Sequence, residues 1–294
     1  EKLEGVSVAD GAIILVGAKD GLQVGTEKAW AAVNEKKIPR MFFISKLDEE
    51  NSDFSKVFDQ LKNKFGNCVV ALQVPIIENG QLKGIVDIPK MKAIYFNGKD
   101  CVEGQIPENM LSQIETYKEG IAEVVAETDE ELMEKYFGGE HFTDEEIRKG
   151  IKLGASNGDI APVLCGSSVQ KAGVRLLMES IIKFMPAHCE KTKVKVLDSA
   201  TREPIEISID EKQPIVQVFK TIADPFVGKI SFLKVISGTM TADSILYNVN
   251  KEKPEKISAI FAMRGKQQIN LSKLVCGDIG AVAKLTVTGT NDTL

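Results

Sequence analysis

Short apolar runs alternate with amphipathic stretches over the first 66 residues of the chain. Residues 10–16 and 41–48 each contain a run of large apolar residues, which is typical of strands buried on both faces of a sheet. Over residues 26–37 and 54–65 the apolar positions recur at helical spacing, and a proline or glycine follows each stretch. The order strand, helix, strand, helix predicts a parallel α/β sheet.

A different pattern occupies residues 67–160. Residues 69–74 and 82–95 have extended character, and the Asn79-Gly80 pair between them predicts a hairpin turn. Amphipathic helices are expected at residues 111–126 and 130–137, and a third short helix after Thr143. The α/β pattern resumes at residue 161, so this block is interpreted as an α+β insertion.

The α/β pattern ends with a strand and loop at residues 161–168 and a helix that runs to about residue 186. Residues 187–213 are charged and irregular, which indicates a linker with an edge strand. From residue 214 onward, short strands separated by turn signals predict a closed β-barrel. The strands are expected at residues 215–222, 229–236, 244–249, 256–263 and 279–287. The expected domains are therefore residues 1–66 with 161–186, the insertion 67–160, the linker 187–213 and the barrel 214–294.

The composition fits a globular chain of two or more domains. It has 294 residues, 43% of them hydrophobic, and a mean hydropathy of −0.06. No apolar run approaches the length of a membrane span, and no secretory signal is recognisable. Five scattered cysteines fit reduced intracellular thiols, and His188 beside Cys189 does not make a zinc site. We expect a cytoplasmic protein without a membrane segment or metal ligands.

The net charge of −5 is unevenly distributed. Residues 100–149 hold 15 acidic and 4 basic residues, a net charge of −11, so the rest of the chain carries +6. An acidic block within a mildly basic frame suggests two kinds of partner. A solvated helical face would give the same composition.

Polar side chains follow the apolar run at residues 41–44. In an open parallel sheet, ligands bind outside the carboxyl ends of the strands, which is where Ser45, Lys46 and Asp48 would lie. An ionised aspartate accepts two parallel hydrogen bonds, which matches the ring N–H and exocyclic amine of guanine, and a lysine stem can lie along a purine face. The pattern resembles the Asn-Lys-x-Asp motif of GTPases, with serine in place of asparagine. The alternative is a solvated strand end with ordinary charges.

A second loop of small residues, Gly166-Ser167-Ser168, follows the strand predicted at residues 161–165. Small residues let backbone N–H groups approach a ligand closely, and one such group could donate to guanine O6. A tight strand–helix turn would need small residues as well.

Taken as a whole, the chain resembles the elongation factor G family of translational GTPases. Matching stretches occur in order across all three regions: 10–12, 21–23, 38–40, 45–48, 84–87, 90–93, 131–136, 162–167, 224–229, 237–238, 277–281 and 289–294. The resemblance implies a GTPase domain with an inserted subdomain and the translation-factor β-barrel. The family couples GTP hydrolysis to the movement of tRNA and mRNA on the ribosome.

The resemblance also implies roles for individual residues. Lys46 and Asp48 would read the guanine of GTP or GDP, with Ser167 and the Ser168 N–H completing the pocket. Ser45 departs from the motif, whose asparagine ties this loop to the phosphate loop. Losing one such hydrogen bond costs roughly 0.5–1.5 kcal/mol, so weaker guanine affinity is expected.

The sequence lacks a Gly-x-x-x-x-Gly-Lys-[Ser/Thr] phosphate loop, the switch segments and the Asp-x-x-Gly turn. In the family these precede the region that matches Glu1, and further domains follow Leu294. We therefore expect a monomeric fragment without catalytic residues of its own, in which Mg²⁺ would bind only with the missing region. The full-length protein would be a GTPase.

Two alternatives are a ribosome-binding paralogue that does not translocate and a ribosomal protection factor of the tetracycline-resistance type. Residues 90–93 and 131–136 favour the elongation factor, whereas Ser45 favours a divergent paralogue. Expected partners are ribosomal stalk proteins at the acidic insertion and rRNA at the barrel. The RNA contacts would be basic side chains: Lys229, Lys251, Lys253, Lys256, Arg264 and Lys266.

Overall fold

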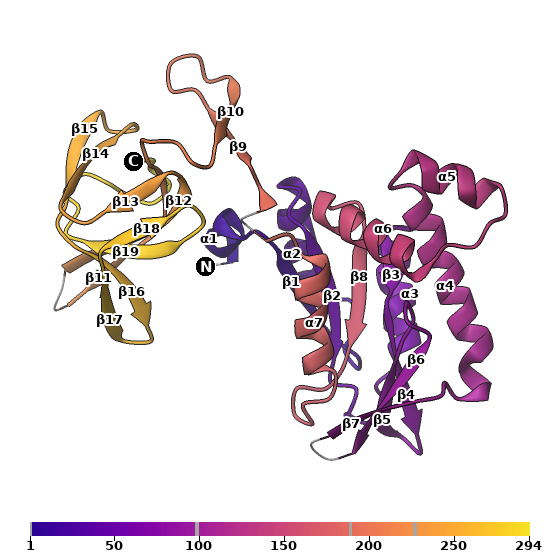
Figure 1. Cartoon of the computed structure of the whole chain (residues 1–294). Coiled ribbons are helices and arrows are strands. Elements are labelled where there is room, and N and C mark those ends of the chain that lie inside the picture. The colour runs from indigo at the N-terminus through magenta and orange to yellow at the C-terminus, as the bar shows by residue number, and fades with distance from the viewer. Residues whose placement is uncertain (1, 98–99, 188–189, 226–227) are drawn as a thin grey trace. The chain divides into compact units, whose positions relative to one another are not determined.

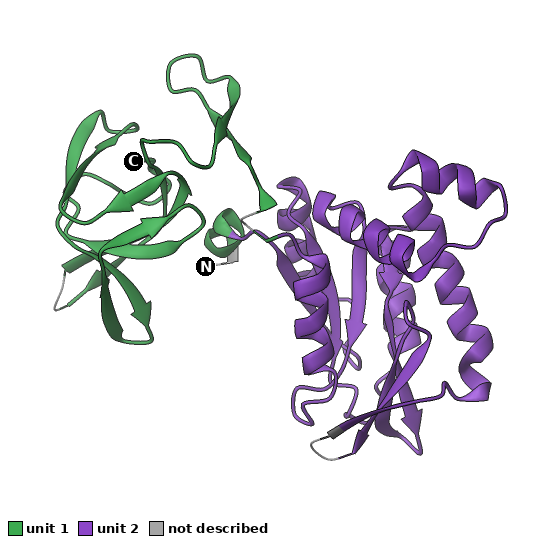
Figure 2. Cartoon of the chain, in the orientation of Figure 1, with its two compact units in different colours: residues 1–8, 187–294 green, residues 9–186 purple. Residues whose placement is uncertain are grey.

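The computed structural model describes residues 2–97, 100–187, 190–225 and 228–294 (Figure 1). The chain divides into two compact units (Figure 2). One is formed by Ala9–Pro186, and we call it the α/β unit. The other combines Glu1–Val8 with Ala187–Leu294, and we call it the β-domain. The described residues do not include the adjacent pair His188 and Cys189, nor Phe226 and Val227 of the matching stretch 224–229.

A parallel four-stranded sheet forms the centre of the α/β unit. Its order is β1 (Ala12–Gly17), β2 (Arg40–Ser45), β8 (Ala161–Cys165) and β3 (Val69–Ala71). The connecting helices are α2 (Val24–Glu35) and α3 (Phe54–Phe65), and α7 (Val174–Phe184) follows β8. The predicted parallel α/β fold is therefore confirmed.

Local sequence explains these elements. Every residue of β2 from Arg40 to Ile44 is buried, as expected for a strand covered on both faces. Helix α3 begins where the carboxylate of Asp53 accepts a hydrogen bond of 3.0 Å from the N–H of Lys56, and it ends at Gly66, whose φ is +91°. The aromatic rings of Trp30 on α2 and Phe65 on α3 stack at 4.4 Å, which packs the two helices together.

The insertion is an antiparallel sheet followed by helices. The sheet order is β4 (Gln73–Glu78), β5 (Gln81–Asp87), β6 (Lys92–Asn97) and β7 (Asp100–Gly104). A short 3₁₀ helix, Glu108–Met110, leads into α4 (Leu111–Ala126), α5 (Glu130–Phe137) and α6 (Asp144–Asn157). Asn79 and Gly80 have φ values of +51° and +73°, so the predicted Asn-Gly hairpin turn is confirmed.

Two strand predictions in this region were wrong in detail. The single strand expected at residues 69–74 is divided at Leu72 between two sheets. The N–H of Leu72 donates to the carbonyl of Val163 on β8, whereas its carbonyl accepts from Ile88 of the insertion, each at 3.0 Å. The extended stretch expected at residues 82–95 is interrupted by a turn at Met91, whose φ is +49°.

The β-domain consists of short antiparallel strands, as the sequence predicts for a translation-factor β-domain. A hairpin of β9 (Lys193–Leu197) and β10 (Pro204–Ser208) occupies the predicted linker. A five-stranded sheet follows with the order β11 (Ile215–Asp224), β12 (Gly228–Ser237), β19 (Ile279–Ala283), β16 (Ile260–Arg264) and β17 (Gln267–Leu271). Two ribbons complete it: β13 (Thr239–Thr241) with β18 (Lys273–Val275), and β14 (Ser244–Asn248) with β15 (Lys253–Ile257).

Two predicted strands are again shorter than expected. Residues 256–263 are divided between β15 and β16, and the strand expected at residues 279–287 ends at Ala283. Beyond Ala283, hydrogen bonds to a side chain help to hold the chain. The buried carboxylate of Glu255 accepts hydrogen bonds from the N–H groups of Thr286, Val287 and Thr288 at 2.7–3.0 Å.

The last residues pair with β11. Val216 and Leu294 exchange backbone hydrogen bonds of 2.7 and 2.8 Å, and the N–H of Val218 donates to the carbonyl of Asp292 at 2.9 Å. Helix α1 (Lys2–Val8) also packs with this domain. The buried amine of Lys234 donates to the carbonyl of Val8 at 2.8 Å.

Across the described part of the chain, the helices are all too short or too polar to cross a lipid bilayer.

Candidate functional site

Two loops meet at the carboxyl edge of the parallel sheet. Residues 45–48 follow β2 and residues 166–168 follow β8, and these strands are direct neighbours, with Ile44 paired with Cys165. The N–H of Gly166 donates to the carbonyl of Ile44 at 3.0 Å, and the N–H of Leu47 donates to the carbonyl of Gly166 at 3.4 Å. The structure therefore brings the two predicted loops together.

Leu47 fixes the first loop in the core. Its side chain is 1% exposed, and its carbonyl accepts a hydrogen bond of 3.2 Å from the hydroxyl of Ser52. Lys46 before it adopts a left-handed conformation, with a φ of +63°, and is exposed. Such a backbone is uncommon for a residue other than glycine. Because Leu47 is buried, its neighbours Lys46 and Asp48 are left at the surface of the loop.

The ammonium group of Lys46 lies between two carboxylates. It is 3.4 Å from Asp20 Oδ2 and 3.6 Å from Glu49 Oε1. The charge of Glu49, and then the hydrogen bond and charge of Asp20, raise the pKa of Lys46. Sequence reasoning missed Asp20, although this residue follows β1 and so belongs to the same carboxyl edge.

Asp48 is half-buried and follows the buried Leu47. Within the described residues, its carboxylate has no hydrogen-bond or ion-pair partner. By contrast, the nearby carboxylate of Asp53 caps helix α3. An ionised carboxylate without a protein partner can accept two hydrogen bonds from a ligand at this position.

The hydroxyl of Ser45 is directed to the neighbouring strand. It donates to the carbonyl oxygen of Val16 on β1 at 3.3 Å. The backbone carbonyl of Ser45 accepts a hydrogen bond of 2.8 Å from the N–H of Ala18, which extends the pairing of β1 and β2. Ser45 thus connects the first loop to the end of β1.

The second loop is a closed turn in which the backbone N–H of Ser168 has no acceptor among the described residues. Ser167 is completely buried, its hydroxyl accepts from the N–H of Gln170 at 3.1 Å, and its own N–H donates to the carbonyl of Ala172 at 2.9 Å. Ser168 is exposed, and no acceptor for its N–H lies among the described residues. Ser168 therefore offers a free donor to a ligand, whereas the polar groups of Ser167 shape the turn.

Packing alone also explains the glycine of this turn. A Cβ on Gly166 would lie 2.4 Å from the carbonyl oxygen of Ala172 and 2.9 Å from the ring of Phe43. Both contacts are too short for real atoms, so only glycine fits. Gly166 is therefore required by the tight turn alone, and its presence does not by itself indicate a bound ligand.

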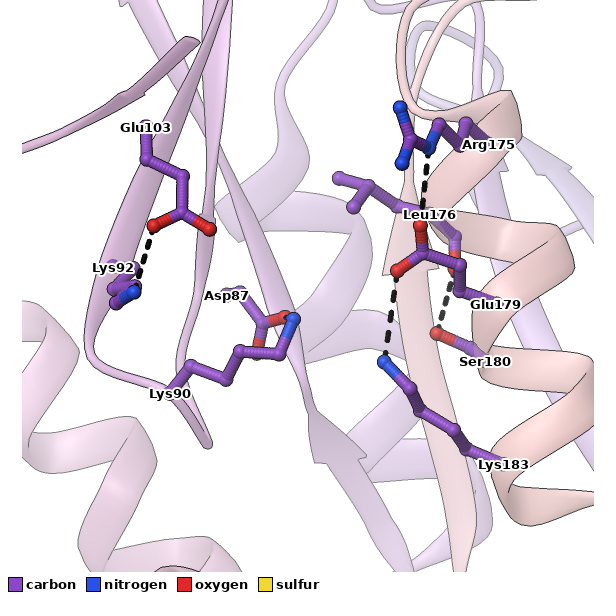
Figure 3. A network of polar contacts seen from close by, with 9 residues as sticks. All are labelled: Asp87, Lys90, Lys92, Glu103, Arg175, Leu176, Glu179, Ser180 and Lys183. Atoms are coloured by element: carbon purple, nitrogen blue, oxygen red, sulfur yellow. Dashed lines mark hydrogen bonds and ion pairs between the residues drawn. The ribbon is translucent and has the colours of Figure 1, made fainter. Parts of the chain in front are cut away.

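The lysines of the stretch 90–93 are engaged in ion pairs (Figure 3). Lys90 Nζ lies 2.8 Å from Asp87 Oδ2, and Lys92 Nζ lies 2.7 Å from Glu103 Oε2. Burial opposes the charged form of Lys90, but Asp87 and other nearby carboxylates outweigh it and raise the pKa of Lys90. Both lysines are therefore paired with carboxylates of the insertion.

The described ranges contain no group of three or more His, Cys, Asp or Glu side chains that could hold a metal ion. The cysteines placed there, Cys68, Cys101, Cys165 and Cys276, are all free. Burial raises the pKa of the Cys165 thiol well above its ordinary value, so this residue at the end of β8 is an unreactive core residue.

Comparison with known proteins gives two family matches and a related structure. Residues 1–187 match the family described as elongation factor Tu GTP binding domain, and residues 215–294 match elongation factor G domain 2. A crystal structure of a protein from Thermus thermophilus is similar over the whole chain, with 25% sequence identity and a TM-score of 0.82. The present chain spans 41% of that protein's length.

Proposed function

Because the chain belongs to the family of the elongation factor Tu GTP-binding domain, we propose that it is part of a translation factor of the elongation factor G type. Such a factor hydrolyses GTP on the ribosome to drive the movement of tRNA and mRNA. The observation that carries the proposal is the match of residues 215–294 to elongation factor G domain 2, directly after the GTPase match. We further propose that the protein acts as a monomer in the cytoplasm.

In this proposal the two loops at the sheet edge bind the guanine base. The carboxylate of Asp48, which has no partner among the described residues, accepts from the ring N–H and the exocyclic amine. The N–H of Ser168 donates to O6, and adenine offers no acceptor there. The stem of Lys46 covers a face of the purine while its ammonium group stays with Asp20 and Glu49.

Ser45 and Ser167 hold these groups in place. Ser45 connects the first loop to Val16, and Ser167 closes the turn that presents Ser168. This sequence contains no phosphate-binding loop, so the present residues would recognise the base only. Contacts to phosphate and magnesium supply most of the nucleotide affinity in such sites, and we therefore expect weak GTP binding and no hydrolysis by this chain alone.

The charge distribution supports separate ribosomal contacts. Helices α4 and α5 and the turn between them present exposed acids, among them Glu123, Glu127 and Glu130. These acids would repel an RNA backbone and suit the stalk proteins. Lys251, Lys253, Lys256, Arg264 and Lys266 are exposed on the β-domain and suit rRNA. Lys229 fits this role less well than the sequence suggested, because its amine donates to the carbonyl of Thr288.

A second candidate is a ribosomal protection factor or a paralogue without translocase activity, and Ser45 in place of asparagine favours it. The test uses the natural protein that contains this chain, with ribosomes, GTP and tRNA bound before translocation. The proposal expects GTP-dependent movement of the mRNA by one codon. Release of ribosome-bound tetracycline without mRNA movement would instead identify the protection factor.

A further inference from the structure

A cleft of about 1080 Å³ opens within the β-domain. One wall is the hairpin β9–β10, and the other includes the outer side of β14 and the residues that follow it. Neither the hairpin nor the ribbon β14–β15 is paired with a further strand in the described part of the chain. Each wall is therefore a two-stranded element, and such elements are marginally stable alone in water.

The hairpin has one apolar face. Its register pairs Val196 with Ile205 and Val194 with Ile207, so these four β-branched side chains lie on the same side. Val196, Ile205 and Ile207 line the cleft, and Ile205 remains 40% exposed. Lys195 and Leu197, which alternate with Val196 along β9, also border it. The hairpin thus directs an incompletely covered apolar surface toward the opposite wall.

The hairpin is attached at its base. The hydroxyl of Ser237 donates to the carbonyl of Ser208 at 2.7 Å, and the N–H of Gly238 donates to the carbonyl of Ile209 at 2.8 Å. At its tip the carboxylate of Asp198 accepts from the N–H groups of Ala200 and Thr201, each at 2.9 Å. The hairpin therefore has a closed tip and a base attached to β12 and the residue after it.

The opposite wall is apolar too. Ile245, Tyr247 and Val249 line the cleft with 72%, 55% and 38% of their surface exposed. Ile245 and Tyr247 alternate with the better-covered Leu246 and Asn248, so they share the outer face of β14. Both walls of the cleft therefore carry apolar side chains that are incompletely covered.

We propose that the hairpin β9–β10 is a strap that closes over β14. Closure packs Val196 and Ile205 against Ile245 and Tyr247, removes both faces from water and shuts the cleft. In the open form the same apolar surface is accessible. The inference is independent of nucleotide binding and of the proposed function.

Hydrogen–deuterium exchange of the whole 294-residue chain tests the strap. Closure protects the amides of residues 193–208, because it stabilises a hairpin that is otherwise marginal. Ile245→Ser combined with Tyr247→Ser should accelerate their exchange roughly tenfold and leave the amides of β12 and β19 unchanged. Ile269→Ser, which alters an exposed apolar side chain on β17 outside the cleft, is the control.

Substitution from the other wall gives an independent result. Ile205→Ser should accelerate exchange of the hairpin as much as the double variant does, and combining all three changes should add little further. If the double variant also changes the exchange of β12 or β19, the Ile205→Ser variant alone serves as the test of the strap. Unchanged hairpin exchange in both variants would overturn the strap. Protection of the hairpin that arises only after ribosomes are added would also overturn it and would assign the cleft to an external partner.

Discussion

The hydroxyl of Ser45 donates a 3.3 Å hydrogen bond to the carbonyl oxygen of Val16, so the side chain that departs from the guanine motif is bound to the end of β1. An asparagine at this position has a longer side chain with both a donor and an acceptor. It could keep a contact with β1 and reach further toward the phosphate side of the site. The identity of residue 45 should therefore influence nucleotide affinity.

Ser45→Asn should tighten GDP binding by up to about 1 kcal/mol, the value of one added hydrogen bond. Titration calorimetry on the nucleotide-binding form of the protein measures the change. Ser45→Ala is the companion variant and should weaken binding, because it removes the hydrogen bond to Val16. If Ser45→Asn gives no gain, the surrounding loop already replaces the asparagine.

Asp48→Asn should shift the preference from GTP toward xanthosine triphosphate, because an amide donates where the carboxylate accepts. We expect GTP affinity to fall by roughly 10- to 100-fold, as two charge-assisted hydrogen bonds are removed. A fluorescent-nucleotide titration in competition with both triphosphates measures this. Glu50→Gln removes an equal charge from an exposed neighbour and should leave selectivity unchanged. Unaltered GTP selectivity of Asp48→Asn would remove Asp48 from the base site.

Gly166→Ala should destabilise the α/β unit by roughly 1–3 kcal/mol, because the new methyl group overlaps the carbonyl of Ala172 and the ring of Phe43. Gly25→Ala is the matched control, since a Cβ there meets nothing within 4 Å and helix α2 gains up to about 1 kcal/mol. Urea unfolding measures both. Equal stability of the two variants would show that the turn can relax around a larger residue.

Glu255 should make the β-domain sensitive to acid. Burial opposes its charge, but hydrogen bonds from Thr286, Val287 and Thr288 lower the pKa of Glu255 to about 2 from an ordinary value of 4.5. Its contribution of roughly 2–3 kcal/mol is therefore present above about pH 4.5 and is lost as the pH falls toward 2.

Glu255→Gln should remove this contribution at neutral pH and flatten the dependence of stability on pH below 4.5. Thermal unfolding followed through the β-domain measures both effects. Glu252→Gln, an exposed residue in the turn before β15, should behave like the unmodified protein. A wild-type profile in the Glu255→Gln variant would mean that the hydrogen bonds do not depend on the charge.

Arg264 is exposed at the end of β16, and Lys266 is exposed in the turn that follows. Neutralising both should weaken binding to the small ribosomal subunit. The slope of log affinity against log salt should also fall by roughly 0.7–0.9 for each phosphate that is no longer neutralised. Glu123→Gln with Glu127→Gln should leave that binding unchanged and alter stalk-dependent GTP turnover. The reverse pattern would show that the two surfaces have been assigned to the wrong partners.

The sequence predicted the elements best where a local pattern determines the environment. The apolar run of β2 specifies a strand buried on both faces. The pair Asn79-Gly80 specifies the hairpin turn between β4 and β5, because both residues adopt positive φ. The run from Val69 onward was harder, because Leu72 pairs with β8 on one side and with the insertion on the other. Hydrophobicity does not say which neighbour a strand residue pairs with.

In the candidate site, too, local sequence predicted some features, whereas others depend on contacts between distant residues. That residues 45–48 and 166–168 follow neighbouring strands could be predicted, because parallel strands end at a common edge. The ion pair between Lys46 and Asp20 could not, since it joins residues 26 positions apart through side-chain geometry alone. The packing of α1 with the β-domain through Lys234 likewise has no local signature in the first eight residues.

The pairing of the last residues with β11 has a consequence for self-association. β11 stands at one end of the five-stranded sheet, where an open row of N–H and C=O groups would invite strand addition by another molecule. The hydrogen bonds that Leu294 and Asp292 make with Val216 and Val218 occupy the first part of this row. Glu255 holds the preceding residues 286–288 in position. We therefore expect the buried carboxylate of Glu255 to help keep this part of β11 closed to strand addition by another molecule.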